Sequence, residues 1–446
     1  MVRRGAVLTS ISLSSFIMPY LGNAINVAAP IMSVALGVSY SYIALLQTAL
    51  ALSTGALAIP MGRLGDLAGR AFIYRLGLVA LAASSLAAFL SSNPLLLTAE
   101  LVAMGAAAAM VFGTNYALIT SIYPEGERGK AIGINTLAVY TGLTAGPLVG
   151  GAFASINWHY IFLTNLALAL ASLALFRGVK CGGPYARKYD VAGAVLLTAS
   201  LSLSVWGLTY SPYMVALGVV LLALFVVYEL RAREPLLDLS LFKRARFSAA
   251  AFAAMLNYMA TFAVVYVLSL YLQDVRGFSP LYAGFLLLSQ PAVMAVFAPI
   301  SGWLSDFVEP GLISSLGMWV AAAALASMAL IGADTPIYAL EAELVLLGLG
   351  FAFFISPNTN IIVSSVEPKH RGVASAVVAV MRLVGQSLSM AIAASTLSSS
   401  TDLLQSARGS LAVLSAIAIA AAVLSLARIR RPFVARRQAA PNARNF

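Results

Sequence analysis

Charged residues are scarce in this sequence. Only 10% of its 446 residues are Asp, Glu, Lys or Arg, whereas about 25% of a typical soluble domain is charged. At the same time, 61% of the residues are hydrophobic and the mean hydropathy is +0.92. Such a chain has too few polar side chains to cover a water-facing surface, so most of its surface must face lipid.

Residues that bind metals, nucleotides or prosthetic groups are also few. The single cysteine, Cys181, excludes an internal disulfide and a multi-cysteine metal site. The two histidines, His159 and His370, have no second ligand at a metal-binding spacing. The stretch "GERGK" (126–130) lacks the spacing of a phosphate-binding loop. The sequence therefore predicts no metal, no cofactor, and neither an enzyme nor an ATP-driven pump.

Long apolar runs, by contrast, are abundant. A membrane-spanning helix needs roughly 20 apolar residues, and fourteen such runs follow one another along the chain. The basic and then apolar start resembles a signal peptide, but no clear cleavage site follows, and we interpret it as the first span. Because lipid offers the backbone no hydrogen-bond partner, all spans are predicted to be helices. They lie near 7–29, 42–61, 72–90, 95–118, 130–153, 160–176, 191–209, 212–229, 248–272, 280–301, 312–331, 336–357, 372–396 and 409–428.

The basic residues predict how the chain is oriented. The net charge is +11, and 24 of the 27 Lys and Arg residues fall in the termini or in loops on one side of the membrane. The positive-inside rule therefore predicts a multi-pass protein of the cell (plasma) membrane with both termini in the cytoplasm. This distribution explains the basic balance without nucleic acid as a partner, and the basic tail could contact anionic membrane lipids.

The two halves of the chain repeat each other. Glu100 and Glu343 lie 243 residues apart, and the same offset relates five further places. Both copies begin on a helix that runs inward, which predicts a parallel repeat about an axis along the membrane normal. The matched pairs are Gly105 with Gly348, Asn115 with Asn358, Arg128-Gly129 with Arg371-Gly372, Ala131 with Ala374, and Gly142 with Gly385.

These features predict an all-α integral membrane fold of fourteen transmembrane helices. Two six-helix bundles form a parallel pseudo-repeat, and two extra helices lie between them. The expected division is an N-terminal bundle at 1–176, a linker with the two extra helices at 177–247, a C-terminal bundle at 248–428 and a basic cytoplasmic tail at 429–446.

Several motifs resemble a known transporter family. The stretch "GRLGDLAGR" (62–70) is similar to the loop 2–3 signature of the major facilitator superfamily, and "GLTAGPLVGG" (142–151) matches the span 5 signature of its antiporters. Stretches that resemble the fourteen-span drug:proton antiporter (multidrug efflux) branch are "NWHYIFLTN" (157–165), "EPLLDLSLFKRARF" (234–247), "GFSPLYAG" (277–284) and "VMRLVGQSL" (380–388). The resemblance implies a secondary active transporter that exports small amphipathic, cationic compounds by alternating access, coupled to protons and working as a monomer.

Two positions depart from the family pattern. Leu21 stands where the family usually has an Asp in span 1, and Leu101 where it usually has an Arg in span 4. Two alternatives therefore stay open. The first is a specific metabolite transporter or uncoupled facilitator. The second is a non-transporting membrane sensor or scaffold, which is disfavoured because no soluble sensory or enzymatic domain is attached.

The span 5 motif is a candidate moving part. Its small residues let helices approach closely, and its proline removes one backbone donor and bends the helix. The prediction is a hinge between the halves that also limits proton leak, with plain tight packing as the alternative. The residues are Gly142, Gly146, Pro147, Gly150 and Gly151.

A second candidate moving part is an inner gate. Asp66 and Asp306 are expected in inner loops. The resemblance to the superfamily implies that each holds the positive N-terminus of a helix in the other half when the gate is shut. The alternative is that both are solvated loop acids. Arg70, Arg128 and Arg371 complete the predicted gate.

Polar groups inside spans are costly, so they are candidates for substrate binding or proton coupling. By the resemblance, spans 4 and 12 line a central cavity. Glu100 and Glu343 lie roughly 10 Å deep in them, where a carboxylate can exchange a proton for a cation; alternatively, both stay wet at the outer mouth. Arg382, within span 13, is interpreted as a substrate anchor, the partner of an acid or a structural hydrogen-bond donor. The other candidates, which could instead only join helices, are Asn23, Asn26, Asn115, Asn358 and Gln290.

The predicted orientation puts the loop that carries Cys181 in the cytoplasm. An impermeant thiol reagent should therefore leave Cys181 unlabelled in intact, right-side-out cells and label it after the membrane is opened. Strong labelling in intact cells would contradict the topology.

Overall fold

The computed structural model describes residues 4–177, 189–232, 235–237, 239–367 and 371–426. Within these ranges every regular element is helical. Thirteen helices, some of them interrupted, are long and apolar enough to cross a membrane. A fourteenth apolar helix, α6, is shorter at 16 residues. The prediction of an all-helical membrane protein with fourteen spans is confirmed.

The helices fall into three groups along the chain. The first bundle comprises α1 (Arg4–Leu36), α2 (Tyr40–Ala68), α3 (Arg70–Leu90), α4 (Pro94–Ile122), α5 (Glu125–Ala154) and α6 (Tyr160–Leu175). Two further helices follow, α7 (Val191–Tyr210) and α8 (Pro212–Glu229). The second bundle begins after a short 3₁₀ turn, η1 (Leu239–Lys243), and comprises α9 (Ala245–Thr261), α10 (Val264–Leu270), the π-helical turn η2 (Tyr271–Val275), α11 (Pro280–Leu287), α12 (Ser289–Leu304), α13 (Pro310–Met328), α14 (Ile337–Ser364), α15 (Arg371–Leu397) and α16 (Leu403–Leu426).

Several helices begin at a capping residue that is followed by a proline in the sequence. The side chains of Asn93, Ser279 and Glu309 each accept hydrogen bonds from backbone N–H groups of the next turn. A proline follows each cap, where its missing N–H costs nothing. Helix ends were harder to predict. α2 continues to Ala68, so Asp66 lies in its last turn rather than in a loop.

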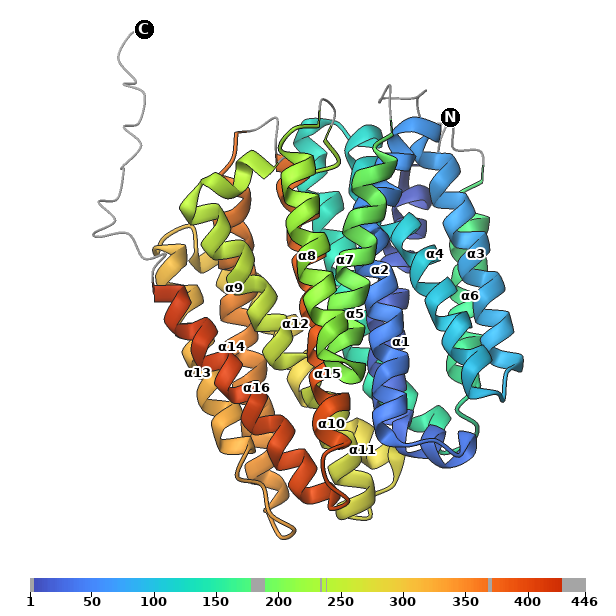
Figure 1. The fold of residues 1–446 in the computed structure, drawn as a ribbon, viewed down its shortest axis with the longest axis vertical. Helices are drawn as coiled ribbons and strands as arrows, with labels where there is room; N and C mark the ends of the chain where they lie inside the picture. Colours follow the sequence, from blue (N-terminus) through green and yellow to red (C-terminus); the bar gives the residue numbers. More distant parts are fainter. Residues whose placement is uncertain (1–3, 178–188, 233–234, 238, 368–370, 427–446) are drawn as a thin grey trace, which may run out of the picture.

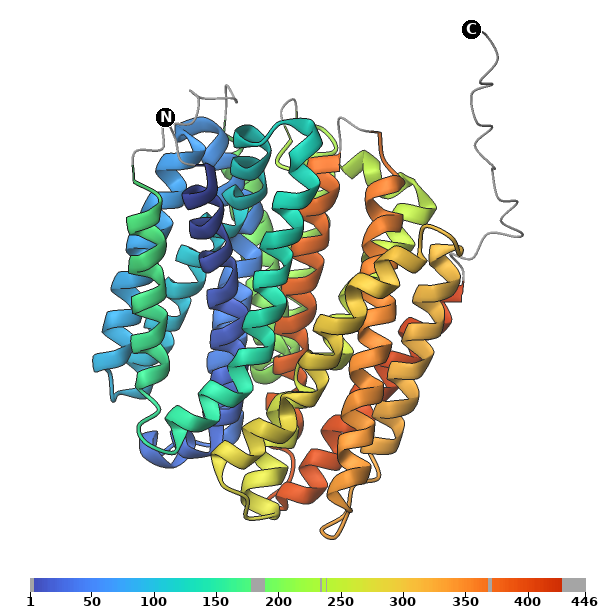
Figure 2. The same cartoon turned by 180° about the vertical axis from the view of Figure 1, so that it is seen from behind.

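The two bundles lie side by side, and the two extra helices cover the seam between them (Figures 1 and 2). α7 packs against α8 and also against α2 and α15, one helix from each bundle. α8 packs mainly on α7 and presents large apolar side chains outward, such as Tyr213 and Leu217. The expectation that spans 7 and 8 lie outside the bundles agrees with this packing.

Glycine contacts show the predicted repeat in three dimensions. A Cβ on Gly105 of α4 would lie 2.6 Å from the carbonyl oxygen of Leu50 on α2. A Cβ on Gly348 of α14 would lie 2.6 Å from the carbonyl oxygen of Gln290 on α12. The second and fourth helices of each bundle therefore touch backbone to backbone at equivalent points, which only glycine permits.

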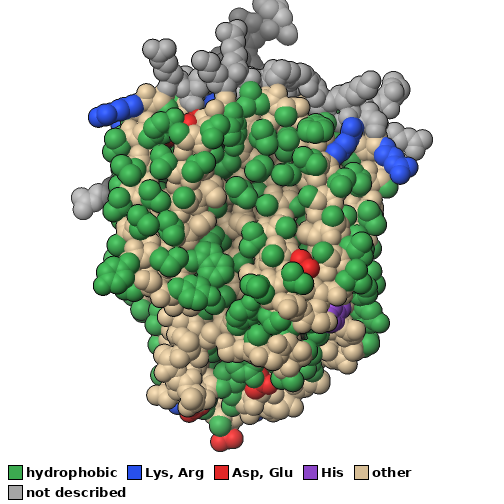
Figure 3. All heavy atoms as spheres, turned by 45° about the vertical axis from the view of Figure 1, so that its right-hand side comes forward, with side chains coloured by type: hydrophobic (Ala, Val, Ile, Leu, Met, Phe, Trp, Pro, Cys, Tyr) green, Lys and Arg blue, Asp and Glu red, His purple; other side chains and the backbone are tan. Residues whose placement is uncertain are grey.

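The outer surface is that of a membrane protein. Figure 3 shows hydrophobic side chains over the height of one face, with Lys and Arg mainly along its upper rim. That rim is the end at which the N-terminal helix begins, and α16 runs back toward it (Figure 1). We call it the basic end; by the positive-inside rule it is the predicted cytoplasmic end.

The bundles meet chiefly along α2 with α15, α5 with α11 and α1 with α10. At the second pair, a Cβ on Gly151 would collide with the carbonyl oxygen of Pro280. From the other side, a Cβ on Gly284 would collide with the carbonyl oxygen of Pro147. Two residues of the span 5 motif thus make a direct backbone contact between the halves.

Gly151→Ala should destabilise the protein by about 1–3 kcal/mol, because its methyl group has no space against the α11 backbone. Gly133→Ala is the matched control on the same helix, since nothing lies within 4 Å of the added carbon. Thermal unfolding of both variants in detergent measures the difference. Equal stability of the two variants would contradict the close contact.

Candidate functional site

A cavity of about 510 Å³ lies between the two bundles. Its walls come from α1, α2, α4 and α5 of the first bundle and from their repeat equivalents in the second, α9 with α10, α12, α14 and α15. None of the described lining residues comes from the third or the sixth helix of either bundle. None comes from the two extra helices, α7 and α8, either. The cavity thus uses equivalent helices of both halves.

The two ends of the cavity differ. At the end away from the basic end, α1 is tied to the second bundle by hydrogen bonds from Gln273 Nε2 (2.8 Å) and Ser269 Oγ (3.3 Å) to the carbonyl oxygen of Val27. The Tyr266 hydroxyl also donates to the carbonyl oxygen of Tyr40 at 2.5 Å. Residues 24–29 of α1 are all fully buried there. This end is closed.

Toward the basic end the cavity continues between the bundles. Ile132, early in α5, and Val363, at the end of α14, are both among the lining residues. The cavity is thus closed at one end and extends toward the basic end at the other.

Most of the wall is apolar or aromatic, with a few uncharged polar groups. Tyr258 packs edge-on against Phe351 with ring centroids 5.2 Å apart. Asn23 donates to the carbonyl oxygen of Leu143 at 2.9 Å, which joins α1 to α5. Gln290 lines the cavity with its side-chain oxygen buried and without a hydrogen-bond partner among the described residues.

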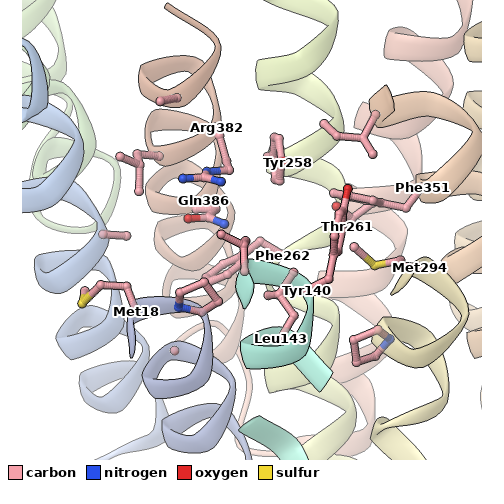
Figure 4. Close-up of a pocket in the computed structure, with 18 of the residues that line it drawn as sticks. Met18, Tyr140, Leu143, Tyr258, Thr261, Phe262, Met294, Phe351, Arg382 and Gln386 are labelled. Carbon is pink, nitrogen blue, oxygen red and sulfur yellow. The ribbon is translucent and has the colours of Figure 1, made fainter. Parts of the chain in front are cut away.

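One lining residue carries a full charge, and it is Arg382. Figure 4 shows its guanidinium pointing from α15 into the cavity, with Gln386 one turn further along the helix and Tyr258 opposite. Within the described part of the chain, no lining residue is an Asp or a Glu.

The two glutamates expected in the cavity lie elsewhere. Glu343 accepts a hydrogen bond from Ser327 of α13, and Glu100 lies beside Ser91, where α3 ends. Each therefore faces the third helix of its own bundle, and neither is among the lining residues. One oxygen of each carboxylate is buried without a hydrogen-bond partner among the described residues.

Three of the predicted asparagines join helices instead of lining the cavity. Asn115 donates to Ser15 on α1 at 2.9 Å, and Asn358 donates to the carbonyl oxygen of Ala250 on α9 at 3.0 Å. These two repeat-related residues thus link the fourth helix of each bundle to its first. Asn26 accepts from Gln47 of α2 at 3.0 Å.

The contacts described for Asp66 and Arg128 are with residues of their own bundle. Asp66 accepts a hydrogen bond from Arg70 Nε at 2.7 Å, while Asp306 is exposed just beyond the end of α12. Arg128 donates to the carbonyl oxygen of Tyr123 at 3.0 Å. Arg371 begins α15, and its side chain lies outside the described residues. The cross-bundle contacts expected of a shut gate stay a prediction for the opposite conformation.

The rest of the span 5 motif packs on α1. A Cβ on Gly142 would lie 2.5 Å from the carbonyl oxygen of Phe16, and one on Gly146 would lie 2.6 Å from Cβ of Asn23. Gly150 abuts the backbone of Ala24 in the same way. The motif thus joins α5 to a helix of its own half and, through Gly151, to the other half.

Several cavity residues were not found from the sequence. The rings of Tyr140, Tyr258 and Phe351 line the wall, as do the amides of Gln47 and Gln386. The two glutamines are polar residues inside spans, a signal that could have marked them. The aromatic residues gave none, because aromatic side chains are equally common at lipid-facing positions.

The comparisons with known proteins agree with this architecture. The family profile described as Major Facilitator Superfamily matches residues 11–390 and 250–444. The chain therefore belongs to the major facilitator superfamily. It is a membrane transporter and not an enzyme.

Its relatives include proteins with different cargoes. It is 28% identical over 392 residues to the riboflavin transporter RibZ of Clostridioides difficile, covering 86% of each chain. It is 30% identical over 354 residues to the tetracenomycin C resistance and export protein of Streptomyces glaucescens, covering 76% of this chain and 66% of the other.

Solved structures show the same fold. A D-xylose–proton symporter superposes with a TM-score of 0.73 at 13% identity, covering 96% of this chain and 98% of the other.

Asp66→Asn should weaken the conformation in which the basic end is shut. There the carboxylate is expected at a helix N-terminus, a contact worth about 0.3–1 kcal/mol. In the present conformation it forms a half-buried ion pair with Arg70 of the same bundle. Spin-label distances across the basic end should therefore shift toward the open state. A lower thermal stability with unchanged distances would instead assign Asp66 a purely local role.

Proposed function

We propose that this transporter exports amphipathic compounds by alternating access. The observation that supports this most directly is the cavity lined by equivalent helices of both bundles, which is closed at one end and continues toward the other. Cavities that bind small molecules are commonly about 300–1,000 Å³, so one of about 510 Å³ suits a compound of drug size.

The composition of the wall supports an amphipathic cargo. Aromatic and aliphatic side chains supply most of the contact, and scattered amides and hydroxyls such as Asn23, Gln290 and Thr261 offer hydrogen bonds without enforcing one geometry. The relatives named for drug resistance and antibiotic export are consistent with a cargo of this kind.

The proposal also includes the membrane, the topology and the working units of the protein. The chain is a plasma-membrane protein with both termini in the cytoplasm, working as a monomer in contact with membrane lipids. Its working units are the bundles at 1–176 and 248–428, joined by a linker at 177–247 and followed by the tail at 429–446. The span 5 glycines act as the hinge between the bundles, since they form a close contact on both sides of α5.

Proton coupling is also part of the proposal, with Glu100 as the coupling group. Its carboxylate lies within a span and has one buried oxygen that lacks a hydrogen-bond partner among the described residues. A proton on that oxygen would relieve the cost of burying a charge.

The family resemblance implies a cationic cargo, and Glu100 and Glu343 were the acids expected to face it in the cavity. Neither is among the residues that line it.

A second candidate function is transport of one metabolite, or facilitation without proton coupling. Leu21 and Leu101, which occupy the family's usual Asp and Arg positions, are fully buried in the apolar core. The similarity to a protein named as a riboflavin transporter favours the same candidate.

Transport in proteoliposomes distinguishes these candidates. Purified protein is reconstituted with an imposed pH gradient and offered a panel of dyes, drugs and riboflavin. Movement of several unrelated amphipathic compounds supports the exporter, and movement of one compound without dependence on the gradient supports the second candidate. No movement of any compound would contradict both.

Glu100→Gln should leave the protein folded, because Gln keeps the size and hydrogen-bonding capacity of the side chain. It should flatten the pH dependence of transport in this assay. Glu343→Gln is the matched control at the repeat-related position, where a hydrogen bond from Ser327 already supports the carboxylate, and its effect should be smaller. A wild-type pH profile in Glu100→Gln would exclude Glu100 as the coupling group.

A further inference from the structure

We infer that the transported compound carries a negative charge, which Arg382 binds, on an aromatic or otherwise flat apolar body. This inference rests on the proposed function and specifies its substrate class. It departs from the cationic cargo that the sequence predicted.

The first support is the position of the charge. Arg382 projects from α15 into the cavity midway between the ends of its helix (Figure 4). A permanently charged guanidinium inside a membrane-spanning bundle is costly unless it faces water or meets an opposite charge. In a substrate cavity, water solvates the guanidinium when the cavity is empty, and an anionic substrate pairs with it when the cavity is occupied.

The second support is that the protein does not neutralise this charge. Among the described residues, Arg382 takes part in no ion pair, and the ion pairs that occur join other arginines to acids near the basic end, such as Arg70 with Asp66 and Arg246 with Glu309. The side-chain partner of Arg382 is the hydroxyl of Tyr258, which is neutral, and no bond to a backbone carbonyl is present within those residues, so the charge of the guanidinium stays uncompensated. The role of partner to an acid is removed, because no described residue lining the cavity is acidic.

The third support is the set of groups around the guanidinium. Tyr258 and Tyr140 both lie near it, and their hydroxyls can donate hydrogen bonds to the oxygens of an anion. Gln386 stands one helical turn away and adds an amide donor (Figure 4). The planar fork of arginine matches a carboxylate or sulfonate with two parallel hydrogen bonds.

The fourth support is the shape of the rest of the wall. The rings of Phe262 and Phe351 and the flexible side chain of Met294 line the cavity beside this polar group. Aromatic rings stack or meet edge-on with a flat aromatic body, and methionine adapts to its outline. The cavity therefore offers one anionic subsite and an apolar, aromatic remainder.

The test uses two dyes that share a xanthene frame and differ in charge. Carboxyfluorescein is the anion and a cationic rhodamine is its counterpart. Binding to the purified full-length protein in detergent is followed by fluorescence anisotropy, and transport is followed in proteoliposomes. Wild-type protein should bind carboxyfluorescein more tightly than the rhodamine.

Three variants identify the group responsible. Arg382→Gln should weaken carboxyfluorescein binding about 10- to 100-fold, as expected for loss of a charge-assisted hydrogen bond, and should leave rhodamine binding unchanged or tighter. Arg382→Lys keeps the charge but loses the planar fork, so it should fall between wild type and Arg382→Gln. Gln386→Glu places a carboxylate one turn from Arg382, where the two can pair, and should reverse the preference in favour of the rhodamine.

The outcomes separate this inference from the proposed function. Equal or tighter binding of the rhodamine by wild type, no binding of carboxyfluorescein, or an Arg382→Gln variant that binds carboxyfluorescein as wild type does would each overturn the inference. Transport of the rhodamine alone would overturn the inference of an anionic cargo but would leave the proposed export function in place. Arg382-dependent binding of carboxyfluorescein without transport of either dye would support the anionic subsite and contradict export.

Discussion

The absence of hydrogen-bond partners in lipid is the constraint on which the rest of this structure depends. It forces every span to be a helix and requires each polar side chain inside a span to find a partner within the protein. Asn115 and Asn358 meet that requirement by bonding to the first helix of their bundles. Other buried atoms have no hydrogen-bond partner among the described residues, and they include one oxygen each of Glu100 and Glu343 and the side-chain oxygen of Gln290.

Close backbone contacts convert these helices into two stiff bodies. Gly105 and Gly348 let the fourth helix of each bundle touch the second at equivalent points, and Gly142 and Gly385 do the same between the fifth helix and the first. Such contacts leave little room for helices to slide within a bundle. The bundles contact each other along α2 with α15, α5 with α11 and α1 with α10, so any motion of one bundle against the other must occur at these pairs.

Much of the fold could be predicted from the sequence, because membrane spans are long, apolar and punctuated by caps, prolines and charges. The internal repeat could also be predicted, since glycines and asparagines recur at one offset.

The residues of the site could be predicted only in part. Asn23, Gln290 and Arg382 do line the cavity, whereas Glu100 and Glu343 do not. Their depth follows from counting residues, but the direction in which they point does not. A membrane helix such as α4 has apolar residues on every side, whether that side faces lipid, a neighbouring helix or an apolar cavity. The periodicity of the sequence therefore does not show which side faces the cavity. Asp66 illustrates the same limit at a helix end, because α2 extends beyond its apolar run.

Arg382 is the one charged wall residue of the cavity among those the structure describes, and this also affects the energetics of the transport cycle. A cell that is negative inside holds cations back and expels anions, with about 2.3 kcal/mol for each unit charge and 100 mV of membrane voltage. An exporter of cations works against that voltage and needs an imported proton, whereas a departing anion is driven out by the voltage itself. With Leu21 buried in the apolar core at the family's usual acidic position, an anionic cargo would make export electrogenic and let the membrane voltage do part of the work assigned elsewhere to a proton.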